Sequence, residues 1–457
     1  MNIASELRQL LEPGIVSDHE QILAEHSGDK WFAHESPEVV VFARSTEDVC
    51  RLLRFANTNK IPVTARGAGY GYVGSCVPVR RGIALSLARM NRIKELNFAD
   101  AIAIAEPGVI TAQLKRAARR EQLFYPPDPA SLEHCTIGGN IATNAGGPRC
   151  LKYGVTRNYV TGLEVVLANG ELLRTGGRIH KNKTGFDLIS LFVGSEGMLG
   201  VVTEITLRLL PLPPARATLS VSFARMSEAA AMVQEIFAAG FLPSALEIAD
   251  KFTLEAARHD TAAAHVPPGN AHLLVELDGQ EETVAAELRK IRALVSRRNP
   301  SALEIATDEA ESERLWALRR EFSNSLRATG LTKLNQDIVV PRSRLVDLIS
   351  FAEELSARSG FPIACFGHAG DGNIHVNIMA EHYNRDAAVR ERVQEALDAL
   401  FRQVLAWGGV ITGEHGIGLA KKRWWSQATG EVADKLHQRL KQALDSSNIL
   451  NPGKFLG

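Results

Sequence analysis

The feature that most constrains the fold is a strand, a helix and a second strand in direct succession, followed at once by a glycine-dense loop. The apolar run EVVVFA (38–43) predicts a strand, and STEDVCRLLRFANTN (45–59) predicts a helix with a capping hydroxyl at its start. IPVTARG (61–67) predicts the second strand, and four glycines crowd into the loop VTARGAGYGYVGS (63–75). The first domain therefore starts as a βαβ unit.

Short apolar runs separated by glycine-rich turns continue this pattern. They predict further strands in GIALSL (82–87), AIAIAEPGV (101–109), LEVVLANGELLRT (163–175) and LGVVTEITLRLLP (199–211). Strands mixed with few helices predict an α+β domain over residues 38–214, preceded by a helical segment at residues 1–37. The proline cluster LLPLPPARA (209–217) marks the end of this domain.

Long helical patterns alternate with strands after the proline cluster. The predicted helices are SEAAAMVQEIFAAG (227–240), EETVAAELRKIRALVSRR (281–298) and DAAVRERVQEALDALFRQVLAWGG (386–409), and AHLLVELDG (271–279) predicts a strand. This alternation predicts a second α+β domain over residues 215–445. The last twelve residues, 446–457, have a turn signature of their own and form a separate C-terminal segment.

Composition narrows the classes of function. A chain of 457 residues is too long for one small module. Lys plus Arg and Asp plus Glu both number 52, so no net charge draws the protein to nucleic acid or to an anionic membrane. The five cysteines include no C-x-x-C pair, which disfavours a disulfide scaffold and a self-contained iron–sulfur cluster. Neither a signal peptide nor a long apolar run occurs, so we expect a soluble protein of a reducing compartment.

Two glycine-dense segments in the first domain predict one long ligand held by backbone amides. The first is the loop at residues 63–75, and the second runs from 126 to 171. Glycine lets successive N–H groups approach an anion such as a diphosphate closely. Neither segment has the spacing of a Rossmann fingerprint or a Walker A loop, so the glycines alone leave an ordinary tight loop open.

A second group of polar residues surrounds the turn FGHAGDGNIHVNIM (366–379). Alternation within it places three polar side chains on one face of a strand: Asn373, His375 and Asn377. His368 lies across the glycine turn, and Glu414 follows in GEHGIG (413–418). A buried polar row is costly unless it is hydrogen-bonded or binds a ligand. Two histidines and one glutamate suit Zn²⁺ or equally Mn²⁺, Fe²⁺ or Co²⁺, while hydrogen-bonded core histidines remain the alternative.

Four segments resemble the FAD-binding domain of the vanillyl-alcohol oxidase and p-cresol methylhydroxylase (PCMH) superfamily. They are ARGAGYG (65–71), TIGGNIATNAGG (136–147), KYGVTRNYVTGLEVVLANGE (152–171) and VGSEGMLGVVTEITLRLLP (193–211). Within it the chain is most similar to the FAD-linked 2-hydroxy acid dehydrogenases, which include D-lactate, D-2-hydroxyglutarate and glycolate enzymes. The resemblance spans nearly the whole chain. It implies an α+β fold with a two-subdomain PCMH-type FAD-binding domain, a substrate (cap) domain built on an antiparallel sheet, and a C-terminal segment that returns to the FAD domain.

The resemblance implies FAD as a non-covalent cofactor, because Tyr70 stands where covalently flavinylated relatives have the attached histidine. The residues implied around the FAD diphosphate are Arg66, Gly67, Ala68, Gly69, Tyr70, Gly71 and Ser75. Those implied around the isoalloxazine and ribityl groups are Asp128, Ser131, Gly138, Gly139, Asn144, Gly146 and Tyr153. Gly200 and Val202 are implied near the adenine, and Asn451 in the C-terminal segment.

GHAGDGNIHVN (367–377) and GEHGIG also match the metal motifs of these dehydrogenases. The resemblance implies His368, His375 and Glu414 as metal ligands, with zinc the first choice, His415 as the catalytic base and Asn377 as a substrate contact. A hydroxy acid also needs a cation for its carboxylate, and LWALRREFSNSLRATGLTK (315–333) offers several. Arg319 stands at the family's substrate arginine, Lys333 is the second choice, and Arg320 is expected on a solvated helix face.

The implied reaction is oxidation of a small D-2-hydroxy acid to its 2-oxo acid while FAD is reduced. Electrons would leave to a non-nicotinamide acceptor: an iron–sulfur subunit, an electron-transfer flavoprotein, a cytochrome or a quinone. Such a partner would place a cytoplasmic protein at the inner face of the membrane, and a homodimer is left open. Three alternatives remain: a non-redox transferase of the alkylglycerone-phosphate synthase type, an iron oxygenase without flavin, and a flavoprotein subunit that only docks partners.

Overall fold

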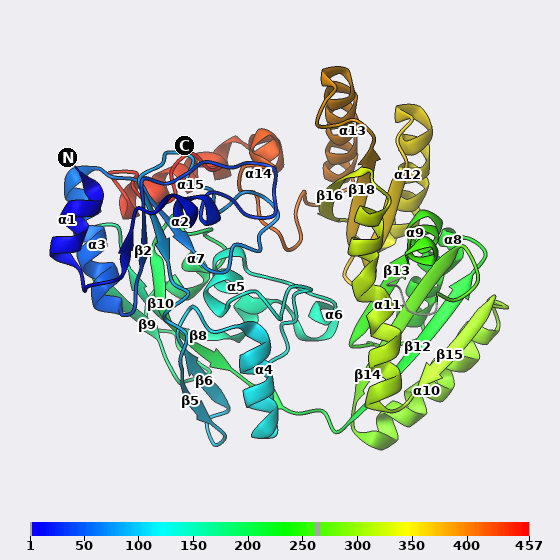
Figure 1. Ribbon diagram of the computed structural model, residues 1–457. Coiled ribbons are helices and arrows are strands. Elements are labelled where there is room, and N and C mark those ends of the chain that lie inside the picture. Colours follow the sequence, from blue (N-terminus) through cyan, green and yellow to red (C-terminus); the bar gives the residue numbers. More distant parts are fainter. Residues whose placement is uncertain (1, 261–265, 457) are drawn as a thin grey trace. The chain divides into compact units, whose positions relative to one another are not determined.

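The computed structural model describes residues 2–260 and 266–456, which fall into two compact units (Figure 1). Unit 1 comprises Met1–Gly146, Val155–Leu212 and Glu414–Gly457, and unit 2 comprises Gly147–Gly154 and Pro213–Gly413. The chain first enters unit 2 for the short segment Gly147–Gly154, and its second entry, at Pro213, lies next to the predicted boundary at 214. The chain re-enters unit 1 at Glu414, whereas the sequence placed this change after residue 445.

The first sheet of unit 1 has four strands in the order β1-β2-β4-β3. These strands and their helices are α1 (Ile3–Leu10), β1 (Val16–Ser17), α2 (Glu20–Glu25), β2 (Val39–Phe42), α3 (Thr46–Asn59), β3 (Val63–Arg66) and β4 (Ile83–Ser86). Ser45 and Asp48 form a capping box at the start of α3, as the predicted capping hydroxyl requires. The predicted strand, helix and strand are confirmed. However, β4 lies parallel between β2 and β3, so the two strands that α3 joins do not pair with each other.

The second sheet of unit 1 has five antiparallel strands in the order β5-β6-β10-β8-β9. Its strands are β5 (Ile93–Asn97), β6 (Ile102–Ala105), β8 (Val160–Val166), β9 (Leu172–Gly176) and β10 (Val201–Arg208), and β7 (Leu123–Phe124) pairs with β11 (Leu210–Pro211). The helices near it are α4 (Thr111–Arg120), α5 (Ile137–Thr143), η1 (Thr156–Tyr159) and α7 (Leu188–Phe192). Two separate sheets agree with the predicted two subdomains.

The C-terminal segment packs into unit 1. It contains η3 (Lys422–Trp424), α14 (Trp425–Thr429) and α15 (Glu431–Leu444). After α15, Leu450 forms a parallel bridge with Val63 at the start of β3, and the Asn451 N–H donates to the carbonyl of Val63 at 2.8 Å. Ile449 and Leu450 are buried in the same apolar core as α1, α3 and the first sheet. The predicted return of the C-terminus to the first domain is thus observed.

Unit 2 is built on one antiparallel sheet of seven strands in the order β15-β12-β14-β13-β17-β18-β16. The strands are β12 (Ala215–Phe223), β13 (Ala245–Ala249), β14 (Ala271–Gly279), β15 (Ala302–Ala306), β16 (Thr332–Val339), β17 (Ile363–His368) and β18 (Asn373–Ala380). The helices are α6 (Cys150–Tyr153), α8 (Met226–Ala238), α9 (Lys251–His259), α10 (Glu281–Ser296), α11 (Glu309–Ala328), η2 (Arg342–Arg344), α12 (Leu345–Ser359) and α13 (Ala387–Ala406). The predicted antiparallel sheet is confirmed.

The two faces of this sheet differ in chemistry. Along β18, Ile374, Val376 and Ile378 point to one face and are fully buried. Residues paired directly across antiparallel strands share a face, so the register defines the opposite one. That face carries Phe366 and Met379, which pack with α9 and α11, and it also carries a polar group: Glu247, Lys333, Asn335, Asp337, His368, Asn373, His375 and Asn377. Nearly all of the unit's candidate site residues therefore lie on a single face.

Within the part of the chain that the structure describes, no helix is both long and apolar enough to cross a lipid bilayer.

Candidate active site

The two histidines of unit 2 lie on neighbouring strands joined by a tight turn. His368 ends β17, and His375 lies in β18 opposite Phe366. The turn requires glycine at Gly372, where φ is +83° and an added Cβ would lie 2.1 Å from the carbonyl oxygen of Val340. The imidazole centroids are 5.6 Å apart and the ring planes meet at 77°. Strand pairing and the turn thus bring both imidazoles together.

Glu414 follows a short stretch of chain that is tied to β16. The Gly413 N–H donates to the carbonyl oxygen and to Oδ2 of Asp337, at 2.8 and 3.1 Å, and Thr412 Oγ1 donates to the same Oδ2 at 2.9 Å. Asp337 is fully buried and pairs with His375 across the sheet. One buried aspartate therefore holds the residue before Glu414 against the strand that pairs with His375.

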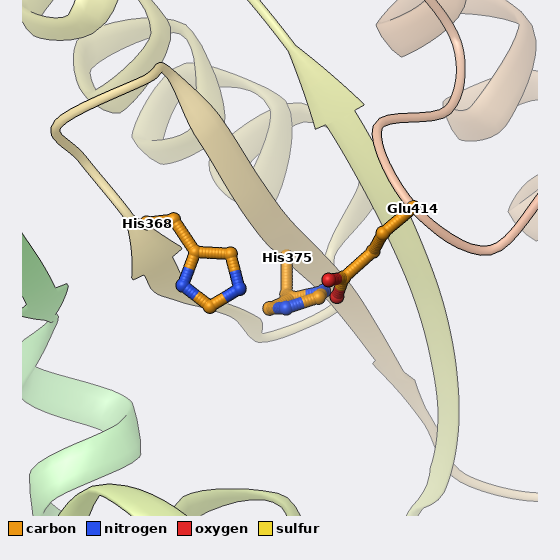
Figure 2. A group of neighbouring side chains, drawn as sticks. All are labelled: His368, His375 and Glu414. Atoms are coloured by element: carbon orange, nitrogen blue, oxygen red, sulfur yellow. The ribbon is translucent and has the colours of Figure 1, made fainter. Parts of the chain in front are cut away.

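His368, His375 and Glu414 point toward one another (Figure 2). One potential ligand atom from each of the three residues lies within 4.8 Å of the other two. Both histidines are buried, and Glu414 is half-buried. Two imidazole nitrogens and one carboxylate oxygen form a donor set that suits a borderline divalent ion and leaves coordination positions open. The three side chains therefore fit the divalent metal that the sequence predicted.

Glu247, in β13, connects this group to a candidate substrate-binding arginine. Glu247 Oε1 lies 2.6 Å from His368 Nδ1, and its Oε2 accepts from Arg319 Nε at 2.6 Å. Burial opposes ionisation of Glu247, but the charges and hydrogen bonds of His368 and Arg319 outweigh it and lower the pKa of the carboxyl. An ionised Glu247 accepts a hydrogen bond from the Nδ1–H group of a neutral His368. The lone pair of the imidazole then lies on Nε2, as metal binding there requires.

Arg319 has the geometry of an anion-binding side chain. It extends from α11, its residue is only 8% exposed, and its guanidinium carbon lies 5.0 Å from the centre of the Phe366 ring. Nε is engaged by Glu247, while neither Nη atom donates a hydrogen bond to any residue that the structure describes. Arg320, the next residue, is exposed and pairs with Glu313. The sequence-based distinction between a substrate arginine and a solvated one therefore agrees with their surroundings.

Lys333, in β16, is a second cation on this face. Its Nζ donates to Ser323 Oγ at 2.6 Å and lies 5.6 Å from the centre of the Phe366 ring. No carboxylate pairs with it among the described residues. Burial, together with the positive charges of Arg327 and Arg319, lowers the pKa of Lys333 to about 7. Because no carboxylate of the described residues pairs with Lys333, its ammonium group is suited to contact the carboxylate of an acidic substrate.

Asn377 and His415 complete the predicted catalytic set. Asn377 is fully buried, and its Nδ2 donates to the carbonyls of Ala364 and His375, each at 3.0 Å. Its Oδ1 has no hydrogen-bond partner within the described chain, so a ligand donor would satisfy it. His415 follows Glu414 directly, and its Nε2 lies 3.6 Å from Glu414 Oε1. The His415 ring packs against Tyr72 with centroids 5.2 Å apart.

The two glycine-dense segments of unit 1 meet. A Cβ added to Gly67 would lie 2.4 Å from Thr136 Oγ1 and 3.6 Å from the Gly139 nitrogen. A Cβ added to Gly138 would lie 2.5 Å from the side chain of Pro107. A side chain at Gly67 would fill the space in which the two loops approach each other, and one at Gly138 would collide with Pro107. The adjoining bare backbones fit a long cofactor held by main-chain N–H groups.

Several predicted FAD residues hold the first glycine loop in shape. Arg66 donates through its guanidinium to the carbonyls of Gly28 and Glu25, at 2.5 and 3.3 Å, and therefore holds the segment after α2 against the loop. Gly69 has φ +70°, and an added Cβ would lie 2.1 Å from Arg66 Nη2. The carbonyl of Gly71 accepts from the Lys30 N–H at 2.9 Å.

Tyr70, next to Ala68 and Gly69, is held between two side chains. Its ring stacks on His134, with centroids 4.7 Å apart and ring planes at 13°. Lys30 Nζ lies 4.6 Å from the centre of the same ring. His134 belongs to the second glycine-rich segment, so this stack also joins the two loops.

The remaining predicted FAD residues occupy turns and strand ends. Asp128 is buried, and the carbonyl of Ser131 accepts from the His134 and Cys135 N–H groups at 2.8 Å. Asn144 ends α5 with φ +51°, two residues before Gly146 closes the first segment of unit 1. In β10, Val202 pairs with Val165, and a Cβ at Gly200 would lie 2.5 Å from Val165 Cγ1.

Tyr153 differs from the other predicted FAD residues in that its segment, Gly147–Gly154, belongs to unit 2. Its hydroxyl donates to Asp278 Oδ2 at 2.9 Å, and Lys152 Nζ donates to Asp278 Oδ1 at 2.5 Å. Arg149 forms two hydrogen bonds with the buried carboxylate of Glu276, at 2.7 and 2.8 Å. Charged pairs therefore anchor this segment, which sequence alone assigned to the FAD domain, to β14 of unit 2.

Sequence reasoning did not assign a role to Glu247 or Asp337. Glu247 is the lone acidic residue of the buried run ALEIA in β13, and this isolated charge was the available signal. Asp337 stands in TKLNQDIV of β16, where it ends a run of three consecutive polar residues. Neither pattern identifies the hydrogen-bond partner, because His368 is distant in sequence from Glu247 and Thr412 is distant from Asp337.

Comparison with known proteins identifies the family. Residues 212–455 match the model of FAD linked oxidases, C-terminal domain, and residues 37–176 match the model of an FAD binding domain. The chain belongs to the FAD-linked oxidase family. The first match alone covers more than half of the chain, and the family model for the FAD domain contains both glycine-dense loops.

Named relatives cover most of the chain. The glycolate oxidase subunit GlcD of Bacillus subtilis (strain 168) is 40% identical, over 92% of this chain and 89% of that protein. A D-lactate dehydrogenase of Anaerostipes hadrus is 33% identical, over 92% of this chain and 89% of that protein. Among solved structures, p-cresol methylhydroxylase with substrate bound has a TM-score of 0.81 at 20% identity and covers 99% of this chain and 96% of that one.

The family and the structural likeness support three sequence-based predictions. The fold is the predicted PCMH-type α+β architecture, and the chain is an FAD-dependent oxidoreductase. FAD is its cofactor. The metal and the individual site residues stay predictions.

We expect Glu247→Gln to weaken metal binding by about 10- to 100-fold, because a neutral amide holds the His368 ring less firmly. The matched control is Glu304→Gln, which removes an exposed carboxylate of β15. Competition between each variant and a chromogenic chelator measures the difference. Equal Zn²⁺ affinity in wild type and Glu247→Gln would show that the Glu247 contact does not serve a metal.

Proposed function

We propose that the protein oxidises a small D-2-hydroxy acid of the D-lactate, glycolate or D-2-hydroxyglutarate class to the 2-oxo acid, with FAD accepting the electrons. The observation that supports this proposal is the grouping of His368 and His375, on one face of the unit 2 sheet, with Glu414. Two cations suited to a carboxylate belong to the same unit: Arg319 in α11, which hydrogen-bonds to Glu247, and Lys333 in β16. The printed names of the relatives, glycolate oxidase subunit and D-lactate dehydrogenase, both point to 2-hydroxy acids.

FAD, when bound, supplies an acceptor for a hydride equivalent from the substrate's α-carbon. The residues proposed to hold it non-covalently are those of the two glycine-dense loops, with Ser75, Gly200, Val202 and Asn451. Asn451 Nδ2 donates to the carbonyls of Ser75 and Glu196, at 2.8 and 2.7 Å, so the C-terminal segment braces the first loop. Tyr153, whose hydroxyl donates to Asp278 Oδ2, is also proposed as an FAD-binding residue.

A divalent ion, held by His368, His375 and Glu414, would supply a Lewis acid for the substrate's hydroxyl and carboxylate oxygens. Arg319 would bind the substrate carboxylate through its two Nη atoms, and Lys333 would add a second positive charge. His415 would accept the hydroxyl proton at a ring nitrogen, which requires a neutral imidazole before the reaction. Loss of that proton and of the α-hydrogen with its electron pair balances the oxidation of the alcohol to a ketone or aldehyde.

The reduced flavin must pass two electrons onward. We propose a non-nicotinamide acceptor: an iron–sulfur subunit, an electron-transfer flavoprotein, a cytochrome or a quinone. The word subunit in the name of the Bacillus subtilis relative supports an acceptor that is a separate chain. A cytoplasmic protein that meets the inner face of the membrane through such a partner is the corresponding location.

A transferase is the main rival. Alkyldihydroxyacetonephosphate synthase has a TM-score of 0.76 to this chain, but at 18% identity the likeness shows the fold alone. A flavin-free iron oxygenase leaves the FAD binding domain without a role. A subunit that only docks partners needs neither the bond between Glu247 and His368 nor the unpaired guanidinium nitrogens of Arg319.

The deciding experiment is an anaerobic visible spectrum of the purified flavoprotein. D-Lactate, glycolate and D-2-hydroxyglutarate are added in turn, before and after treatment with a chelator. We expect one acid to bleach the flavin band and chelation to prevent the bleaching. A flavin that all three acids leave oxidised would overturn the proposal in favour of the transferase or docking roles.

Substrate binding should weaken as the pH rises through about 7 because of Lys333. Its pKa in the folded protein is lowered, so the ammonium is charged below pH 7 and becomes neutral above it. The dissociation constant of the acid, read from flavin perturbation by a non-reacting analogue, should therefore increase above pH 7. Lys333→Arg stays charged throughout, and its profile should be flat over the same range. Identical profiles for wild type and Lys333→Arg would remove Lys333 from substrate binding.

A further inference from the structure

A buried carboxylate in unit 1 joins the first glycine loop to the turn that follows His415. Glu196 Oε1 accepts from the Ile417 N–H at 2.7 Å, and its Oε2 accepts from the Gly418 N–H at 2.9 Å. Ser75 Oγ donates to the same Oε2 at 2.8 Å. Glu196 is only 5% exposed, so these three donors replace the water that the carboxylate loses on folding.

The backbone of Glu196 is held in an unfavourable conformation. Its φ of +49° lies in the left-handed region, which costs a non-glycine residue on the order of 1–2 kcal/mol. The Glu196 N–H donates to the carbonyl of Ala142 at 2.8 Å, and its own carbonyl accepts from Asn451 Nδ2 at 2.7 Å. Hydrogen bonds to both backbone polar groups of Glu196 thus hold the conformation that directs its side chain toward the turn.

The turn itself is shaped around this carboxylate. Gly416 has φ +87°, and an added Cβ would lie 2.6 Å from Glu196 Oε1. Gly418 has φ +48°, and an added Cβ would lie 2.3 Å from the carbonyl of Val73. The next residue, Leu419, donates through its N–H to the same carbonyl at 2.7 Å. The turn therefore rests on Glu196 and on Val73, whose own loop also carries Ser75.

Both oxygens of the Glu196 carboxyl are needed for this role. Burial raises the pKa of the carboxyl, and hydrogen bonds from Ile417, Ser75 and Gly418 and the charge of Lys454 offset only part of that rise. An amide side chain has one accepting oxygen and turns an NH₂ group toward a donor. It therefore cannot serve both backbone N–H groups.

We propose that Glu196 is a positioning residue for the turn Gly416–Gly418, and through it for His415. The inference rests on the proposed function, because it gives His415 the role of base. It goes beyond that function by assigning a purpose to a carboxylate that contacts neither of the two histidine ligands. In this arrangement one side chain fixes the base relative to the glycine loop proposed to hold the cofactor.

The test compares FAD-loaded Glu196→Gln and Glu196→Asp with wild type and with Glu204→Gln, which changes a partly exposed carboxylate of β10 paired with Lys94. Hydrogen exchange of peptides spanning residues 414–424 reports the amides of Ile417 and Gly418 directly. We expect exchange there to quicken by about 10-fold or more in both Glu196 variants, as loss of hydrogen bonds to a charged acceptor predicts. Glu204→Gln should match wild type.

Steady-state kinetics supply the second readout. We expect kcat to fall by about 10-fold in the Glu196 variants while KM changes by less than about 2-fold, because the base is misplaced and the substrate carboxylate contacts remain. Unchanged exchange at residues 414–424 would overturn the proposed contact. Faster exchange with unchanged kcat would overturn the positioning role. Full turnover in His415→Ala would overturn the proposed base instead, and the exchange rates of the Glu196 variants do not depend on that result.

Discussion

Removing the divalent metal should abolish reduction of the flavin by the hydroxy acid while leaving the flavin bound. A divalent ion held by His368, His375 and Glu414 would stabilise charge on the substrate oxygen by several kcal/mol, so the expected loss in the rate of flavin reduction is on the order of 10³-fold. Glu414→Gln should give a similar loss, since an amide oxygen binds a divalent ion far less strongly than a carboxylate. Stopped-flow absorbance of the flavin band measures the rate in each case.

The controls separate loss of metal from loss of fold. Re-addition of Zn²⁺ or Mn²⁺ should restore the rate in chelated wild type and not in Glu414→Gln. Glu381→Gln, an exposed carboxylate directly after β18, should behave as wild type. Retention of the full rate by protein shown to contain no metal would contradict the proposed site, and a flavin lost together with the metal would assign the three ligands to cofactor binding.

The part of the site that could be predicted from sequence is the part encoded by short-range pattern. Alternation along GNIHVNIM predicted that His375 and Asn377 share a face, and β18 confirms the strand. The glycine turn before it brings His368 to the neighbouring strand, because only four residues separate the end of β17 from the start of β18. Local periodicity also located the four helices that it predicted, α3, α8, α10 and α13, to within about three residues at each end.

Contacts between distant segments could not be predicted in the same way. Glu247 and His368 are 121 positions apart, and Asp337 and Gly413 are 76 apart. Their pairing depends on the order of strands in the sheet, which periodicity along one strand does not encode. For the same reason, β4 enters between β2 and β3, and the chain gave no local sign of this.

The segment Gly147–Gly154 shows the limit of motif reasoning. Its sequence places it inside the FAD-binding motifs, and Tyr153 was predicted to contact the cofactor on that basis. The hydrogen bonds of Arg149 to Glu276 and of Lys152 to Asp278 show that the segment packs with β14, while the contact of Tyr153 with the cofactor stays a prediction. Pairing with buried carboxylates decides with which unit this segment packs, whatever the unit of its neighbours in sequence, because an unpaired buried carboxylate is costly. A motif can therefore be read correctly while the segment that carries it packs with another domain.

Replacing Arg319 should have the second large effect. Arg319→Met keeps the length and apolar packing of the side chain against Phe366 but removes the guanidinium. Loss of one member of a buried, hydrogen-bonded charge pair costs about 2–5 kcal/mol, so kcat/KM should fall on the order of 10²- to 10³-fold. Part of the loss should come from Glu247, because the substitution removes Arg319 as a hydrogen-bond partner of this buried carboxylate and leaves it only His368 of these two residues.

The neighbouring residue supplies the matched control. Arg320 lies on the same helix but is exposed, and its pair with Glu313 is a surface contact worth about 0–1 kcal/mol. Arg320→Met should therefore leave kcat/KM within about 2-fold of wild type. The kcat/KM of Arg319→Lys should lie between those of Arg319→Met and Arg320→Met. An ammonium keeps the charge, but it cannot both donate to Glu247 and bind a carboxylate through two parallel hydrogen bonds. If Arg319→Met and Arg320→Met have equal kcat/KM with full FAD content, the substrate carboxylate binds elsewhere, and Arg319 serves only to neutralise Glu247.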